Sequence, residues 1–221
     1  MNFAGHVEVA RDGSLVRGDN EARFHLGAVL PDLAAMGRFR LLARPDDPDI
    51  TAGIDIHHRT DDAFHRHRWF RDTSGAVVRR LDRAGVPRGA ARAVGHVGIE
   101  LLLDGHLLRQ PGGLGPAVDA AIEAAGDAVE ELVPLVDEGQ RGHWRHHLEQ
   151  VAVWSVPDDY HRPDAVAARL ERILRRRPRL ALPPEAIATV AEALATQQDA
   201  VRDGAAPLIA ELRHQVSASP G

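Results

Sequence analysis

Five side chains that can bind a metal ion or move a proton lie within eleven positions in the first half of the chain. They are His57, His58, Asp61, His65 and His67. On an α-helix, which turns once per 3.6 residues, His57, Asp61 and His65 have the spacing i, i+4, i+8 and share one face. Three such side chains on one face are costly to bury unless they meet water, each other or a cation. A metal site is therefore the first hypothesis for this segment.

A second pair of the same kind occurs about thirty residues later. His96 and Glu100 are again four residues apart, and they interrupt the otherwise apolar segment Ala90–Leu103. Helical bundles use pairs of this kind to hold metal ions between facing helices. Asp61, which lies between histidines in the first segment, is then placed to bridge two ions.

Two further candidate ligands stand alone in apolar sequence. His6 lies within Phe3–Ala10, and Asp32 follows Pro31 between Leu30 and Leu33. Each has a simpler explanation, because His6 can be a satisfied core residue and Asp32 can cap a following helix. The metal hypothesis requires both of them to converge on the His57 segment. The later pair His143 and His147 is better explained as an exposed helix start.

The composition restricts the chemistry. The chain has 221 residues, thirteen histidines, no cysteine and a formal net charge of −5. The lack of cysteine excludes disulfides, thiolate zinc sites and cysteine nucleophiles, and the remaining His, Asp and Glu ligands suit zinc, manganese or iron. The net charge does not indicate a nucleic-acid-binding surface. No apolar run has the length of a membrane span and no leader-like segment is present, so we expect a cytoplasmic protein.

The hydrophobic pattern is helical wherever it is regular, with no strand alternation, fixed repeat or phosphate-binding glycine loop. We expect an all-α, single-domain helical bundle over residues 1–216. The segment 110–116, with the sequence Gln-Pro-Gly-Gly-Leu-Gly-Pro, is the strongest turn signal, and we expect a hinge there. Residues 217–221 are expected to form a disordered tail.

Four motifs in matching order resemble the acyl carrier protein phosphodiesterase family. They are the start Met1–His6, the segment Leu26–Asp32, the segment Gly53–Asp61 and the late motif Arg175–Leu180. The resemblance implies an HD-like helical metallohydrolase that releases 4′-phosphopantetheine from a serine of a carrier protein, usually with manganese.

The chain departs from that family at the positions of His65, His96 and Glu100, where the family has aspartates. The order His57, Asp61 and His67, followed by His96 and Glu100, is instead similar to the zinc-dependent phospholipase C and single-strand nuclease group. That group also has an early histidine and an isolated aspartate, which correspond here to His6 and Asp32. It uses in addition an N-terminal tryptophan and a further histidine, which this chain lacks, so two metal ions are expected rather than three.

Together these observations predict a metal-dependent phosphoric ester hydrolase. The predicted ligands of two divalent ions (Mn, Zn or Fe) are His6, Asp32, His57, Asp61, His65 or His67, His96 and Glu100. Helical phase favours His65, whereas the phospholipase-like spacing favours His67. A metal-activated water is the expected nucleophile, and His58 and Arg59 are expected to hold the phosphate. The partner-binding candidates, which suit an acidic acyl carrier protein, are Arg175, Arg176, Arg177 and Arg179.

Two other classes of protein are consistent with the same residues. Histidine and carboxylate ligands on helices also hold di-iron centres that activate oxygen. A non-catalytic helical protein with a degenerate site would carry the same side chains without binding metal. Bound-metal analysis separates these alternatives.

Overall fold

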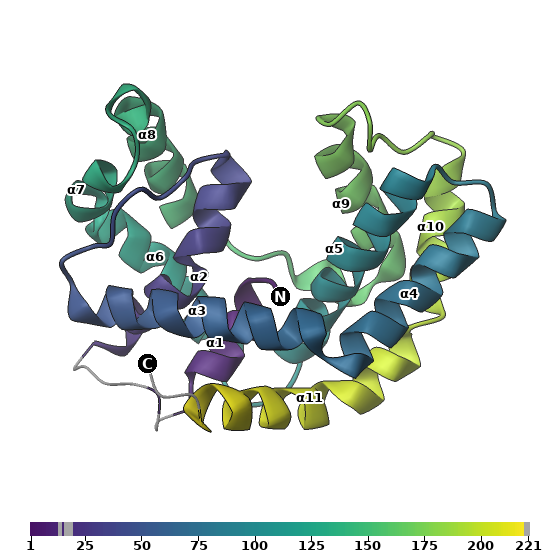
Figure 1. The fold of residues 1–221 in the computed structure, drawn as a ribbon, viewed down its shortest axis with the longest axis horizontal. Helices are drawn as coiled ribbons and strands as arrows, with labels where there is room; N and C mark the ends of the chain where they lie inside the picture. Colours follow the sequence, from purple (N-terminus) through teal and green to yellow (C-terminus); the bar gives the residue numbers. More distant parts are fainter. Residues whose placement is uncertain (13–14, 16–19, 219–221) are drawn as a thin grey trace. The chain divides into compact units, whose positions relative to one another are not determined.

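The computed structural model describes residues 1–12, 15 and 20–218 of the chain (Figure 1). Over these residues it contains eleven α-helices, three short 3-10 helices and no β-strand. The prediction of an all-α fold is thereby confirmed. Among the described residues, no helix is both long enough and apolar enough to span a membrane.

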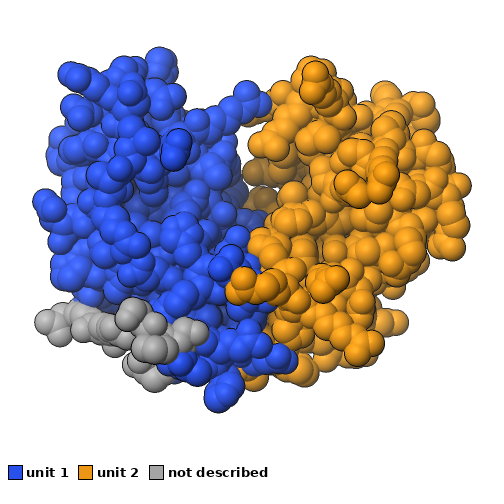
Figure 2. Space-filling model, in the orientation of Figure 1, with its two compact units in different colours: residues 1–63, 111–156, 211–221 blue, residues 64–110, 157–210 orange. Residues whose placement is uncertain are grey.

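The helices group into two compact units, which are coloured separately in Figure 2. Unit 1 comprises residues 1–63, 111–156 and 211–221, and unit 2 comprises residues 64–110 and 157–210. The boundary after Gln110 falls within the segment predicted to be a hinge. Because each unit is assembled from separate stretches of sequence, the chain does not divide at this turn into two independent halves.

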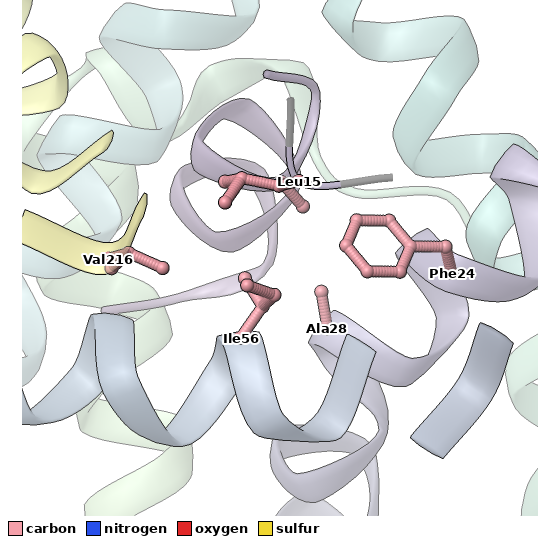
Figure 3. Packing of buried hydrophobic residues seen from close by; sticks show 6 residues of the cluster. Leu15, Phe24, Ala28, Ile56 and Val216 are labelled. Atoms are coloured by element: carbon pink, nitrogen blue, oxygen red, sulfur yellow. The ribbon is translucent and has the colours of Figure 1, made fainter. Parts of the chain in front are cut away.

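Unit 1 is built around the second and third helices of the chain. Its elements are α1 (Phe3–Ala10), α2 (Glu21–Gly37), most of α3 (Pro48–Arg66), α6 (Leu114–Asp127), α7 (Val129–Leu132), α8 (Arg141–Ala152) and the end of α11 (Gln198–Ala218). Helix α2 packs against α1, α6 and α8. Leu15, Phe24, Ala28, Ile56 and Val216 meet in one buried apolar cluster that joins α2 and α3 to the end of α11 (Figure 3). This cluster fixes the helices that carry Asp32 and His57.

Two glycines let α2 and α3 cross with their backbones in contact. A Cβ atom added to Gly27 would lie 2.9 Å from the Cα atom of Gly53, and one added to Gly53 would lie 2.8 Å from the Cα atom of Gly27. Such a Cβ on Gly53 would also overlap the carbonyl oxygen of Phe24. Only glycine fits at this crossing, because any other side chain would force the two helices apart.

The sequence around α3 explains where this helix begins and ends. The carboxylate of Asp47 accepts hydrogen bonds from the backbone N–H groups of Asp49 and Ile50, at 2.8 and 2.9 Å. Pro48 is the first helical residue, a position where its missing N–H costs nothing. The helix ends at Arg66, and the side chain of His67 accepts a hydrogen bond from the N–H of Trp69 at 3.1 Å, which caps α4 (Arg68–Arg83).

Unit 2 is centred on the antiparallel pair of α4 and α5 (Arg88–Leu108), which make the most extensive contact between any two of its helices. Close approach is again possible because of a glycine, since a Cβ on Gly95 would lie 2.8 Å from the carbonyl oxygen of Ser74. The other helices are α9 (Pro163–Arg175) and α10 (Ala186–Ala195), which pack against each other. Both also contact α5, and α10 contacts α4.

Two segments differ from the sequence-based expectations. Helix α2 continues through Pro31, so Asp32 lies inside a helix and does not cap one. Helix α11 includes Ser217 and Ala218, so the prediction of a disordered tail is wrong at these two residues. Residues 219–221 of that predicted tail lie outside the described residues.

Candidate metal-binding sites

The structure brings four of the predicted ligands of unit 1 together. His6 on α1, Asp32 on α2 and His57 on α3 each offer one ligand atom, and these three atoms lie within 4.8 Å of one another. The Nε2 atom of His6 is 3.7 Å from a carboxylate oxygen of Asp32 and 3.8 Å from one of Asp61. These separations are too long for hydrogen bonds, whereas ligands of one ion commonly approach each other to roughly 3–4 Å, since each lies about 2.1 Å from the ion.

His57 is held in one tautomer by the backbone of α2. Its Nδ1 atom lies 2.8 Å from the carbonyl oxygen of Ala28. A carbonyl oxygen can only accept, so Nδ1 carries the proton and Nε2 carries the lone pair when the ring is neutral. Metal-binding histidines usually have such a partner on the second nitrogen, because it fixes the ring and raises its basicity. The backbone therefore prepares His57 to act as a ligand through Nε2.

His6 is fully buried, and neither ring nitrogen has a hydrogen-bond partner. The ring stacks on that of His57, with centroids 4.1 Å apart. Leaving a buried polar group without a partner costs about 1–3 kcal/mol. Oδ1 of Asp61 accepts a hydrogen bond from the N-terminal ammonium of Met1 at 2.8 Å. A metal ion bound between Asp32, Asp61 and His6 would give the His6 ring the partner that it lacks.

The buried histidines of this cluster make the metal-free protein sensitive to acid. Burial lowers the pKa of His57 to about 4 and lowers the pKa of His6 well below 6.5. Since the unfolded chain takes up these protons near pH 6.5, the stabilisation is complete above that pH and is lost as the pH falls towards 4. His57 alone accounts for a loss of about 3 kcal/mol over this range.

We therefore expect the free energy of unfolding, measured in chelator between pH 7 and 4, to fall less steeply in His57→Gln than in the wild type. His214→Gln, which changes an exposed histidine of the same unit, is the matched control and should retain the wild-type slope. Equal slopes for wild type and His57→Gln would contradict the assignment of this histidine as buried and neutral.

A second cluster lies within unit 2 and has closer contacts. The Nε2 atoms of His65 and His96 are 3.2 Å apart, and they lie 3.1 and 3.2 Å from the same carboxylate oxygen of Glu100. All three atoms therefore face a common point. Mutual distances of this size are those of ligand atoms that share an ion at about 2.1 Å.

Glu100 is ionised despite being buried. Burial opposes the charge, but the hydrogen bonds from His65 and His96 help to hold the pKa of this carboxyl well below its usual range. Phe70 lies edge-on to both histidine rings, with centroids 5.2 Å away in each case. An anionic oxygen, two imidazoles and an aromatic wall together form a site that suits a divalent cation.

The structure places His65 and His67 in different roles. His65 belongs to the Glu100 cluster, whereas His67 caps α4 through its Nδ1 atom. We expect His65→Ala to reduce the number of tightly bound zinc ions per chain by one. His67→Ala should leave that number unchanged and cost about 1 kcal/mol of stability through the lost cap. Metal titration and thermal unfolding of the two variants measure this, and loss of an ion in His67→Ala would reverse the assignment.

The two residues predicted to hold a phosphate lie beside the first cluster. The His58 side chain is exposed, and its ring is edge-on to that of His57, with centroids 5.3 Å apart. Arg59 donates a hydrogen bond from Nη1 to the carbonyl oxygen of Val216 at 2.9 Å. Arg59 therefore also fastens α3 to the end of α11.

The predicted partner-binding arginines lie at the end of α9 and in the turn that follows. All four are exposed, namely Arg175, Arg176, Arg177 and Arg179. The guanidinium of Arg175 pairs with Glu171 one turn earlier, at 2.6 Å. Their exposure is compatible with the predicted role in binding an acidic partner.

Sequence reasoning missed the groups that position the candidate ligands. The carbonyl of Ala28, which orients His57, carries no side-chain signal. Gly27 and Gly53, which let α2 approach α3, each belong to one of the four motifs, but their contact is visible only in the fold. Phe70, which covers the second cluster, lies five residues after His65 in a helix that begins only after His65.

Comparisons of this chain with protein-family models, with curated proteins and with solved structures gave no match. The likeness to the acyl carrier protein phosphodiesterase family therefore rests on the four motifs and stays a prediction. The geometry of the two clusters is independent of that likeness.

Proposed function

We propose that this protein is a metal-dependent phosphoric ester hydrolase that binds one divalent ion in each cluster. The first ion is held by His6, Asp32, His57 and Asp61, and the second by His65, His96 and Glu100. The observation that carries the proposal is His6, a fully buried histidine with two unpartnered ring nitrogens beside two carboxylates.

The ligand atoms fit a cation better than they fit one another. Neutral imidazole is the form that binds metals, and burial keeps both His6 and His57 neutral at pH 7. Two carboxylates face these neutral rings, and the N-terminal ammonium of Met1 donates a hydrogen bond to Asp61 at 2.8 Å. Two negative charges and one positive charge leave these groups of the first site with a net negative charge that a divalent ion would offset. Nitrogen and oxygen ligands without thiolate suit zinc, manganese or iron.

When bound, such ions lower the pKa of water towards neutrality and stabilise the negative charge of a phosphoryl group in the transition state. The chain supplies the remaining functions. Asp32 and Asp61, whose side chains are 29 % and 37 % exposed, can reach solvent and accept a proton from attacking water. His58, exposed and next to His57, can bind the phosphate or donate a proton to the leaving alkoxide.

The proposal is tested first by metal content and activity. Protein purified without chelator should contain zinc, manganese or iron, and should hydrolyse bis-p-nitrophenyl phosphate or p-nitrophenyl phosphate in a reaction that EDTA stops and metal restores. His57→Ala should lose both metal and activity, whereas His214→Ala should keep both. Activity that persists in EDTA, or protein that binds no divalent ion, would refute the proposal. Bound iron with a visible absorption band would favour the oxygen-activating alternative.

The substrate class that we propose is the phosphodiester between 4′-phosphopantetheine and the serine of an acyl carrier protein. The support is the motif resemblance together with four exposed arginines that can meet an acidic protein surface. Replacing all four arginines with alanine should slow release from holo carrier protein and leave hydrolysis of the small diester unchanged. If this variant and the wild type act on the carrier protein at equal rates, the proposed substrate is refuted, but the proposed hydrolase activity is not.

A further inference from the structure

A separate pocket in unit 1 lies where the end of α2 meets α8. Its volume is about 460 Å³, within the range of about 300–1,000 Å³ that is usual for small-molecule sites. The described residues that supply polar side chains to it are Arg38, Gln140, His143, His146, His147 and Gln150. None of its described lining residues carries a carboxylate. Each of these polar side chains has an N–H group that can donate a hydrogen bond, although that of His147 is already bonded to the carbonyl oxygen of Leu33.

Arg38 reaches this pocket from a strained backbone position. It follows the last residue of α2 with φ 63° and ψ 31°, and it is the one non-glycine residue with positive φ among those described. Helices commonly end with glycine in this left-handed conformation, and another residue there costs about 1–2 kcal/mol. Strain of this kind persists where a side chain has a function. The chain thus places a guanidinium where stability alone favours glycine.

The wall of the pocket next to Arg38 is fixed by packing. The Nε2 atom of His147 donates to the carbonyl oxygen of Leu33 at 2.9 Å, and its ring stacks on Trp144. Phe39 packs against both rings, with centroids 5.0 Å from Trp144 and 5.6 Å from His147. A Cβ on Gly37 would lie 2.6 Å from the Phe39 ring, so the turn that leads into Arg38 has no room for a side chain.

We propose that this pocket binds the phosphate group of a small organic phosphate. Arg38 supplies a permanent positive charge and a planar pair of donors that matches phosphate oxygens. The imidazoles of His143 and His146 and the amides of the two glutamines supply further donors, and the Phe39 ring offers an apolar surface to the organic part. None of these residues belongs to the two metal clusters, so the site is additional to the proposed hydrolytic function.

Isothermal titration in EDTA, which removes any contribution from the metal sites, tests this proposal. The wild-type chain should bind inorganic phosphate at one site, and should bind phenyl phosphate more tightly because of Phe39. Equal affinity for inorganic phosphate and phenyl phosphate would indicate that the pocket binds free phosphate, and would overturn the proposal that its ligand is an organic phosphate. Arg38→Gln should lower the affinity for both ligands by about tenfold or more, as expected for a lost charge-assisted hydrogen bond.

Two further variants separate binding from folding. Arg38→Gly should weaken phosphate binding as much as Arg38→Gln does, while its melting temperature stays level or rises because the backbone strain is removed. Arg40→Gln removes the same charge from an exposed residue outside the pocket and should bind phosphate like the wild type. The proposal is overturned if the wild type binds no phosphate, if Arg38→Gln binds it normally, or if Arg40→Gln loses as much affinity.

Discussion

Gly53→Ala should destabilise the protein by about 3 kcal/mol or more and weaken metal binding at the first cluster. The added methyl group would overlap the carbonyl oxygen of Phe24 and lie 2.8 Å from the Cα atom of Gly27. Because both of these atoms belong to the backbone of α2, the helices must separate, and overpacking of this kind costs about 1–3 kcal/mol or more. Movement of α3 would also withdraw the His57 ring from the carbonyl of Ala28.

A glycine-to-alanine substitution in another helix should have the opposite effect on stability. In Gly75→Ala, on α4, the new methyl group would meet only the mobile end of the Arg79 side chain, at 3.1 Å. Alanine is favoured over glycine inside a helix by about 1 kcal/mol, so this variant should be as stable as the wild type or more stable. Urea unfolding of the two variants measures the difference. A stable Gly53→Ala with unchanged zinc affinity would show that the close helix crossing does not position the site.

The helical spacing of the candidate ligands predicted which residues of the same helix lie close together in each cluster. Spacing alone put His96 and Glu100 on one face of α5, and the structure places both beside His65. The helical spacing also favoured His65 over His67 as a candidate metal ligand. The physical reason is that α3 ends at Arg66, so the helical register that carries His57, Asp61 and His65 does not extend to His67.

The convergence of the distant candidate ligands could not be predicted in the same way. His6 and Asp32 reach His57 only because α1 packs on α2 and because α2 crosses α3 at two glycines. In the sequence, His6 is an ordinary polar interruption of an apolar helix, and its burial was the simpler expectation. What distinguishes it is that both ring nitrogens lack partners while two carboxylates lie nearby, a property of the fold and not of the spacing.

Helix termini were also only partly predictable. The prolines and aspartates around Asp47 and Pro48 favour a loop that continues to Thr51, yet α3 begins at Pro48. The physical reason is that an aspartate before a proline is also a common helix entry. Pro31 suggested a break before Asp32, yet α2 passes through it. Proline removes one backbone hydrogen bond and normally kinks a helix. Here the packing of α2 against α1 and α6, which buries residues on both sides of Pro31, outweighs this local cost.

We expect Asp32→Asn to preserve the stability of the metal-free protein but to reduce the additional stability that the protein gains by binding metal. Asparagine has nearly the same shape but no charge, so the substitution removes one of the two carboxylates near the buried His6. Without metal, the removal of one of the two negative charges near His6 should leave the protein equally stable or slightly more stable. With metal, the loss of an anionic ligand should greatly reduce the stabilisation.

Thermal unfolding with and without zinc gives the expected magnitudes. An ion present at about 100 times its Kd stabilises the folded state by about 2.7 kcal/mol, which for a chain of this size raises Tm by about 5–10 °C. If Asp32→Asn lowers the zinc affinity about a hundredfold, the same zinc concentration stabilises the variant by only about 0.4 kcal/mol. This corresponds to a rise in Tm of about 1 °C. Hydrolysis at that concentration should fall with site occupancy.

Asp62→Asn is the matched control, because it removes the same charge from an exposed position next to Asp61 on α3. It should retain the full zinc-dependent shift, since the cluster is formed by specific atoms and not by the acidity of the surface. If both variants lose the shift equally, zinc binds to the general negative charge of α3. If neither loses it, Asp32 is not a ligand, and the partnerless nitrogens of His6 need another explanation.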